Sequence, residues 1–81
     1  MAEISTAPRL LRRIDPARNM ARFYVIAVLP TLFGTPSVVR RCGRIGSRGR
    51  ERIDLFERSE DANRAFDRLL QAKRRRGYVD R

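Results

Sequence analysis

Apolar positions divide the chain into several strand-like segments followed by one helix-like segment. Residues 21–29 are the clearest strand, because aromatic and β-branched side chains dominate there. Both alternating faces of this segment are apolar, which predicts a central strand that is covered at least partly on each side. The pattern predicts two further strands at 37–45 and 50–56, which the glycine-containing turn 46–49 joins as a hairpin.

Each of the two hairpin strands is expected to turn one face towards the core. The side chains expected to point inward are Val39, Gly43, Ile45, Ile53 and Leu55. Arg41 fits this assignment poorly, so this residue must lie at a sheet edge, extend its charged end outward or mark a β-bulge.

The first residues carry a weaker pattern. Residues 1–8 are mostly small and polar, and we expect them to form a flexible tail. Residues 9–14 have mixed polarity and fit either a turn of helix or an edge strand. Asp15 and Pro16 end this segment, because a residue before proline avoids the helical conformation.

Residues 59–75 are predicted to form a helix with one apolar face. That face consists of Ala62, Ala65, Phe66, Leu69 and Leu70. Ser59 is expected to be the N-cap, and Gly77 is expected to stop the chain from continuing as a helix. Tyr78 and Val79 are expected to fold back on the body of the domain.

The order of these segments predicts an α+β fold. We expect a small, twisted antiparallel sheet of four to five strands, with one C-terminal amphipathic helix packed on it. Residues 9–81 would form this single domain. One helix covers one face of such a sheet, which leaves the other face for solvent or a partner.

The charge balance of the 81 residues adds a candidate function. Nineteen Lys and Arg residues face nine Asp and Glu residues, which gives a formal net charge of +10. The isoelectric point of about 11.6 is typical of a protein that binds nucleic acid. The alternative is a solvated basic surface without a partner.

Residue types that the chain lacks argue against several classes of protein. With one cysteine and no histidine, a disulfide scaffold in the monomer and a zinc site of Cys and His ligands are excluded. Since no nucleophile and base pair is visible, we expect neither enzymatic activity nor a cofactor. No apolar run approaches the ~20 residues of a membrane span, and no secretory signal begins the chain. We therefore expect a cytoplasmic protein with no membrane partner.

Arginines concentrate in the predicted hairpin. Across residues 40–52 six arginines face only Glu51, and a second basic run, Lys73–Arg76, closes the helix. The candidate phosphate contacts are Arg40, Arg44, Arg48, Arg50, Lys73 and Arg75. The alternatives are pairing of the hairpin arginines with Asp54, Glu57 and Asp67, and stabilisation of the helix dipole by the second run.

Four stretches of the sequence resemble the WGR domain, a family named for a Trp-Gly-Arg triplet on a strand before a glycine turn. The matching stretch here is Cys42-Gly43-Arg44, followed by Ile45-Gly46. The second stretch is the helix with its spaced alanines and Phe66, which ends in Lys73-Arg74-Arg75-Arg76-Gly77-Tyr78. Arg22-Phe23-Tyr24 is similar to the opening strand, and Ile14-Asp15-Pro16 with Asn19 is similar to the lead-in of short bacterial members.

The resemblance implies a binding module. WGR domains of poly(ADP-ribose) polymerases bind DNA near strand breaks and relay this binding to a separate catalytic domain, which short bacterial members lack. There the motif Trp packs on DNA and the motif Arg contacts DNA and other domains, so Arg44 carries over as a contact and Gly43 as a backbone requirement. Cys42 replaces the Trp, and a thiol offers no aromatic stacking. Cys42 itself is either a redox-sensitive thiol or a small, half-buried hydrophobic residue.

We therefore expect a non-enzymatic module that binds nucleic acid, DNA more than RNA, through phosphate contacts with little sequence specificity. The alternative is a regulatory module whose uncovered sheet face docks another protein, for example an acidic one.

Overall fold

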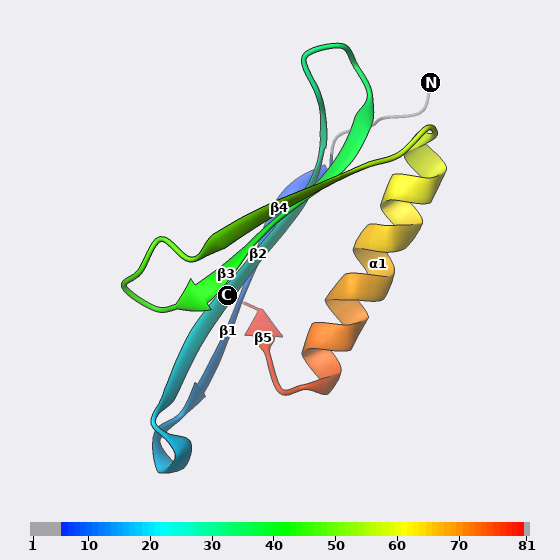
Figure 1. Ribbon diagram of the computed structural model, residues 1–81. Helices are drawn as coiled ribbons and strands as arrows, with labels where there is room; N and C mark the ends of the chain where they lie inside the picture. Colours follow the sequence, from blue (N-terminus) through cyan, green and yellow to red (C-terminus); the bar gives the residue numbers. More distant parts are fainter. Residues whose placement is uncertain (1–5, 81) are drawn as a thin grey trace.

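A computed structural model describes residues 6–80, and it describes their side chains from Pro8 onward. Five strands, a short 3-10 helix and one α-helix follow one another along the chain (Figure 1). They are β1 (Thr6–Asp15), η1 (Pro16–Arg18), β2 (Met20–Pro30), β3 (Pro36–Arg44), β4 (Arg50–Leu55), α1 (Ser59–Arg75) and β5 (Val79–Asp80).

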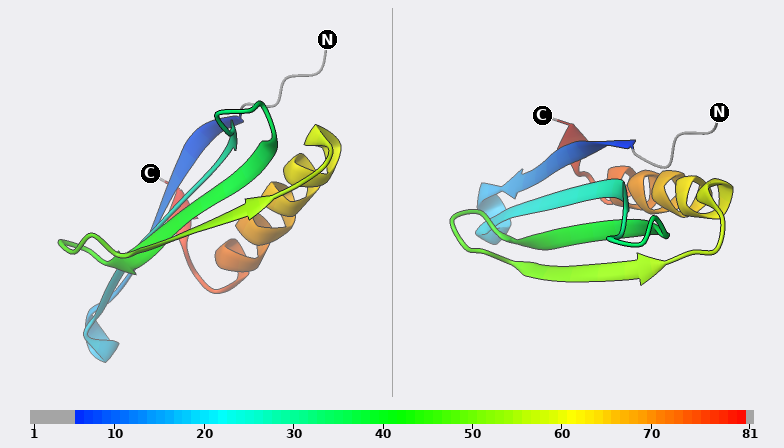
Figure 2. Two further views of the ribbon diagram at one scale, coloured as in Figure 1. Left: turned by 45° about the horizontal axis from the view of Figure 1, so that its top comes forward. Right: turned by 90° about the horizontal axis from the view of Figure 1, so that it is seen from above.

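The strands form one antiparallel sheet in the order β4-β3-β2-β1-β5, and α1 crosses one face of this sheet (Figure 2). The predicted α+β fold with one C-terminal helix is thus confirmed, as is the central position of the strand around residues 21–29. The weak pattern near the N-terminus is resolved as a strand. Because β5 pairs with its outer side, β1 is not an edge strand.

The predicted tail is partly wrong. Residues 6–8 belong to β1, whereas residues 1–5 lie outside the described part. Pairing with β2 holds β1 in the sheet from Thr6 onward, with a shift in register between Thr6 and Arg9.

The core lies between α1 and the face of the sheet that α1 covers. Strand side chains in this core alternate along each strand, as the two-residue period of a strand requires. The buried residues are Leu11, Tyr24, Ile26, Val28 and Val38 from the strands, Ala62, Ala65, Phe66 and Leu70 from α1, and Tyr78. The predicted apolar face of the helix is confirmed, with Leu69 partly buried against this core.

The predicted inward faces of β3 and β4 are wrong. In the observed register Val38 lies opposite the buried Val28, so the Val38 side of β3 faces the helix and the Val39 side faces away. Ile53 and Leu55 share the outer face and are 54% and 64% exposed. The prediction failed because the covered face of β3 continues from Val38 into polar residues, which made the opposite face look more apolar.

Arg41 lies on this outer face without a bulge, because the register between β2 and β3 is continuous around it. Its guanidinium forms an exposed ion pair with Glu51 at 3.3 Å.

Helix α1 has the predicted bounds but a different N-cap. Arg58 occupies the N-cap position without a capping side-chain hydrogen bond. Ser59 is the first helical residue and is buried. Its hydroxyl lies 3.4 Å from Oε1 of Glu60, so it does not cap the backbone.

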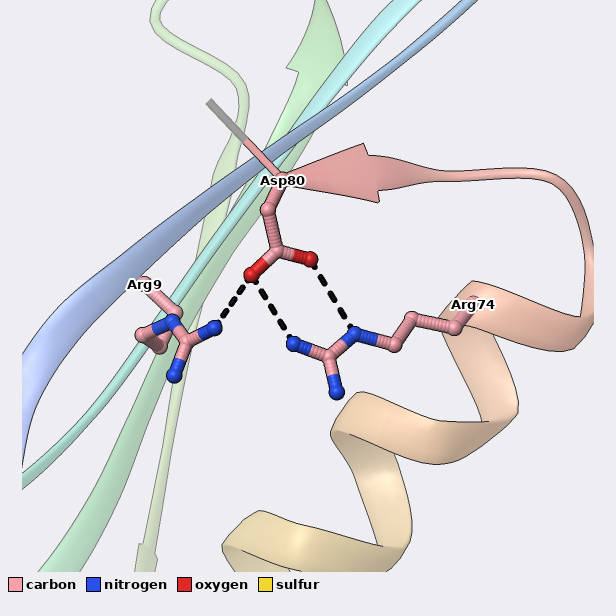
Figure 3. Close-up of polar contacts among 3 residues, drawn as sticks. All are labelled: Arg9, Arg74 and Asp80. Atoms are coloured by element: carbon pink, nitrogen blue, oxygen red, sulfur yellow. Dashed lines mark hydrogen bonds and ion pairs between the residues drawn. The ribbon is translucent and has the colours of Figure 1, made fainter.

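The end of α1 is tied to the sheet. The chain turns at Gly77, which has a φ of +96°, and the Tyr78 backbone N–H donates to the carbonyl of Lys73 at 3.1 Å. Asp80 accepts two hydrogen bonds from Arg74, at 2.8 and 3.0 Å, and another from Arg9 of β1 (Figure 3). The hydrogen bonds from Arg74 and Arg9 lower the pKa of Asp80 to about 2. Tyr78 and Val79 fold back on the domain as expected.

Candidate nucleic-acid interface

The covered side of the sheet carries a group of basic side chains near the C-terminal end of α1. Arg22 lies opposite Arg44 in the register of β2 and β3, and Arg50 lies opposite Cys42 in that of β3 and β4. Because side chains alternate along a strand, Arg22, Arg44 and Arg50 lie on the same face of the sheet as the buried Tyr24. Figure 1 shows that this part of the sheet extends past the end of the helix.

Lys73 joins this group from the last turn of α1. Its Nζ lies 4.8 Å from the ring centroid of Tyr24 and 5.1 Å from that of Tyr78, and the two rings meet edge to face. Burial lowers the pKa of Lys73, and the positive charges of Arg76, Arg22 and Arg40 lower it further, although Cys42 acts in the opposite direction. Arg22, Arg40 and Arg76 thus lie within electrostatic range of Lys73.

Arg13 extends the group from β1. It pairs with Arg22 in the register, and its Nε lies 3.5 Å from the point where a Cβ at Gly77 would be. We call Arg13, Arg22, Arg44, Arg50, Lys73 and Arg76 the basic cluster. Within residues 6–80 none of these six side chains forms an ion pair with a carboxylate.

A small hollow borders the cluster at the start of β2. Its volume is about 110 Å³, and its polar lining includes Arg18, Asn19, Arg22 and Arg44. Asn19 has a left-handed backbone with a φ of 52°, which closes the turn between η1 and β2. The hollow is open to solvent and is lined by Arg22 and Arg44, which have no ion pair among residues 6–80, and by Arg18, which pairs with Asp15 at 3.6 Å. Two arginines without a carboxylate partner make it suited to an anionic group.

Arg40 is half-buried beneath the helix and differs from the other predicted contacts. Its guanidinium is paired with Asp54 at 3.0 Å, and Arg52 contacts the same carboxylate at 3.4 Å. Its Nε and the hydroxyl of Tyr24 are buried without a hydrogen-bond partner in the described part of the chain. Burial raises the pKa of Tyr24, an effect that the neighbouring Arg40 partly offsets. The pairing with Asp54 considered from the sequence is therefore present at Arg40, whereas Glu57 and Asp67 make no such pair among residues 6–80.

Two predicted contacts lie away from the basic cluster. Arg48 lines a hollow with Arg41, Gly49 and Glu51 beside the hairpin loop. Arg75 is exposed, and it follows Lys73 by two positions, so the helical period directs it away from the sheet. Of the six predicted residues, the structure brings together Arg44, Arg50 and Lys73, with Arg40 beneath them.

Sequence reasoning missed Arg13, Arg22 and Arg76 as members of the cluster. Arg22 carried a usable signal, because it alternates with Tyr24 and Ile26 on one face of the clearest strand. Arg13 could not be placed without the register of β1, which depends on pairing between segments and not on local pattern.

The backbone at Gly43 leaves no room for a side chain. A Cβ at Gly43 would lie 2.6 Å from Cα of Gly49, and a Cβ at Gly49 would lie 2.4 Å from the carbonyl oxygen of Cys42. The hairpin loop therefore folds directly onto β3, and the hydroxyl of Ser47 donates to the carbonyl of Arg44 at 2.8 Å to hold its turn.

Cys42 is half-buried and packs against the core beside Tyr24, its partner across β2 and β3. This environment agrees with the interpretation as a small hydrophobic residue. The described residues hold no group of three or more Cys, Asp or Glu side chains placed to bind a metal ion. Helix α1, the α-helix among residues 6–80, is too short or too polar to span a bilayer.

Comparison with known proteins agrees with the fold and the motif. The family model of the WGR domain matches residues 7–81. An uncharacterized protein of Sinorhizobium fredii, y4dW, is 46% identical over 71 residues, which are 88% of this chain and 35% of that protein. A crystal structure of a Bacteroides fragilis protein shares the fold with a TM-score of 0.80 at 24% identity, over 93% of this chain and 19% of that one.

This chain spans about a third of the length of its S. fredii relative, so the comparison concerns one module of that protein. The WGR domain alone is a non-catalytic module, and the family is known to bind DNA. The match over residues 7–81, together with the Gly43-Arg44 strand, the glycine-containing loop and the helix that ends in Gly77-Tyr78, shows that the chain belongs to the WGR domain family.

Proposed function

We propose that this chain binds nucleic acid through its phosphate backbone, at the basic cluster, and has no catalytic activity of its own. One observation carries the proposal: six cationic side chains from four strands and the end of the helix converge without a carboxylate partner among the described residues. Like charges held this close oppose folding, and a polyanion that displaces its counterions would relieve the repulsion.

Helix geometry also supports this assignment. The last turn of α1 carries a partial negative charge of about half a unit, which stabilises nearby cations. This charge is too small to neutralise six cations, so the surface retains a strong attraction for anions. Guanidinium groups bind phosphate through two parallel hydrogen bonds, and five of the six members are arginines.

Duplex DNA is the proposed partner, because the family is known to bind DNA. With Cys42 in place of the motif Trp, binding here would depend on phosphate contacts, and we propose little sequence specificity. A protein with an acidic surface is the competing partner for the same cluster, since its carboxylates match the same guanidinium groups.

The test is fluorescence anisotropy of a short labelled DNA duplex with the wild-type chain and a triple variant, Arg22→Gln, Arg44→Gln and Arg50→Gln. All three arginines are exposed, so their replacement leaves the core intact. We expect affinity to fall by a factor on the order of 10–100.

A matched variant controls for net charge. Arg64→Gln, Arg68→Gln and Arg75→Gln remove the same charge from exposed positions of α1, and affinity should stay within about threefold of wild type. Equal losses in both triple variants would refute a localised site. No binding of duplex DNA, single-stranded DNA or RNA by the wild-type chain at low salt would refute the proposal.

A further inference from the structure

The face of the sheet opposite α1 is apolar, and among residues 6–80 no helix lies over it (Figure 2). The hairpin loop reaches onto one end of this face, where Gly49 lies close to Gly43 and Phe23. Large side chains on this face remain exposed, although each strand is paired within the sheet. They are Leu10, Ile14, Leu29, Ile53 and Leu55, with Val79 on the short β5. We call this surface the open face.

Charged side chains are distributed unequally between the two faces of the sheet. On strands β1–β4 the charged side chains of the open face are Arg12, Arg41 and Glu51, and the last two neutralise each other in an ion pair. Arg12, and Arg48 of the hairpin loop, which lines a hollow with Arg41 and Glu51, leave this face with a small part of the chain's net charge of +10. Two copies would repel strongly through the basic cluster, whereas electrostatic repulsion opposes contact through the open face least.

The open face is uneven in shape as well as apolar. A hollow of about 210 Å³ runs over its centre, and its lining includes Val25, Ala27 and Val39 from the two central strands. Leu10 is paired with Val25 on one flank and Ile53 with Val39 on the other, so exposed apolar side chains border the hollow on both sides. A face that has both a hollow and raised apolar side chains can complement a second copy of itself.

The available area is near what a specific interface needs. Four strands spaced about 4.8 Å apart and about eight residues long present a face of roughly 500 Å². Two copies would therefore bury roughly 1,000 Å², the lower bound for a specific interface. An exposed apolar patch of about this size is at the upper end for monomeric proteins.

The free edge of the sheet is less suited to self-association. Strand β4 forms one edge, and four of its six residues are charged: Arg50, Glu51, Arg52 and Asp54. Charged side chains on an edge strand oppose the pairing of strands between molecules. Pairing along the β4 edge is thus disfavoured. At the other edge β5 covers β1 only at Leu11 and Arg12, and the rest of β1 carries charged residues at Arg9, Arg13 and Asp15, which oppose pairing there as well.

We propose that two copies of this chain associate through their open faces, sheet against sheet, as a symmetric dimer. Ile53 and Leu55 of each copy pack on the central hollow of the other, and the two basic clusters face outward on opposite sides. This inference is independent of nucleic-acid binding, because the two surfaces lie on opposite faces of the sheet.

The test is the molar mass in solution, measured by sedimentation equilibrium over a range of concentrations after nuclease treatment. The wild-type chain should move from the 9.4 kDa of one copy towards twice this mass as concentration rises. Ile53→Lys and Leu55→Lys each place two cations in the symmetric contact and should hold the mass at that of one copy. Both residues are more than half exposed, so the folded monomer should survive, as far-ultraviolet circular dichroism would confirm.

The matched control is Leu32→Lys, which adds the same charge at a side chain that is 94% exposed in the β2–β3 loop. This variant should dimerise as the wild type does. A wild-type chain that stays monomeric at every concentration would overturn the proposal, and the open face would then await a different protein partner. Dimers that persist in both Ile53→Lys and Leu55→Lys would overturn it as well, because association would then use another surface.

Discussion

At Gly43 the backbone of β3 approaches the hairpin loop so closely that no side chain fits between them. A Cβ there would lie 2.6 Å from Cα of Gly49, and backbone atoms cannot move aside as the end of a flexible side chain can. Gly43→Ala should therefore lower the free energy of unfolding by about 1–3 kcal/mol, the usual cost of overpacking. Urea denaturation of the two proteins measures this difference.

A substitution at Gly34 is the control for Gly43→Ala. It shows how much stability is lost when a glycine is replaced at a position where the new side chain is not crowded. Gly34 has a φ of +82° and open space around its Cα, and asparagine tolerates this backbone conformation. Gly34→Asn should change stability by less than about 1 kcal/mol. If Gly43→Ala were as mild, the close approach of the loop to β3 would not constrain this position.

Cys42 shows how one substitution changes what a motif can do while the fold persists. The residue retains the inward position of its strand and packs beside Tyr24, so the fold needs only a small apolar group there. The lost aromatic ring removes a stacking surface, and the proposed function therefore depends on the surrounding cations alone. The replacement of the motif Trp by Cys42 could be recognised from the sequence alone, because the three motif residues are adjacent in the chain.

The end of helix α1 depends on one carboxylate. Asp80 joins Arg74 of α1 to Arg9 of β1, and these hydrogen bonds hold its pKa at about 2, below the ordinary 3.8 (Figure 3). Because the folded pKa is the lower one, the stabilisation is complete above a pH of about 4 and is lost as the pH falls to about 2. Asp80→Asn should lower Tm at neutral pH, and the difference from wild type should disappear over that range.

Thermal unfolding followed by circular dichroism across this pH range tests the prediction. Asp67→Asn is the control, since it removes the same charge from an exposed position of α1 that has no ion pair within residues 6–80. A Tm difference for Asp80→Asn that persisted at a pH of about 2 would contradict the assigned role of the carboxylate.

Elements differ in how far local pattern determines them. The bounds of α1 were predictable because Ala62, Phe66 and Leu69 follow the helical period without interruption. The inward face of β3 was not, because Arg40 lies on the covered side, where its partner Asp54 comes from the next strand. The sequence offered Asp54 as one of three possible partners for the hairpin arginines, but the register that makes the pair with Arg40 depends on contacts between strands.

The basic cluster could be predicted only in part, because some of its members come together only through strand pairing. Arg44 and Arg50 stood out because they lie in a dense run of arginines, and Lys73 because it closes the helix. Arg13 and Arg22 reach the same place only through the pairing of β1, β2 and β3, which joins residues distant in the chain. Arg75 and Arg48 belong to the same runs, yet helix period and loop geometry place them elsewhere.

Across the whole molecule, the sheet separates a charged side from an apolar side, and the two should respond to salt in opposite ways. Phosphate binding releases counterions, so the logarithm of the DNA association constant should fall linearly with the logarithm of salt concentration, with a slope of about −0.9 per contact. Replacing Arg22, Arg44 and Arg50 by glutamine should make this slope shallower by about 3.

The proposed dimer should behave differently, because its interface buries apolar groups and little net charge. At about 1 M salt the Debye length falls to about 3 Å, so repulsion between two copies, each with a net charge of +10, is largely screened. Dimerisation should then be as strong as at low salt or stronger, whereas DNA binding is lost. Sedimentation equilibrium and anisotropy on the same samples would show both trends. A dimer that dissociates as salt rises would instead be held by charge and would not involve the open face.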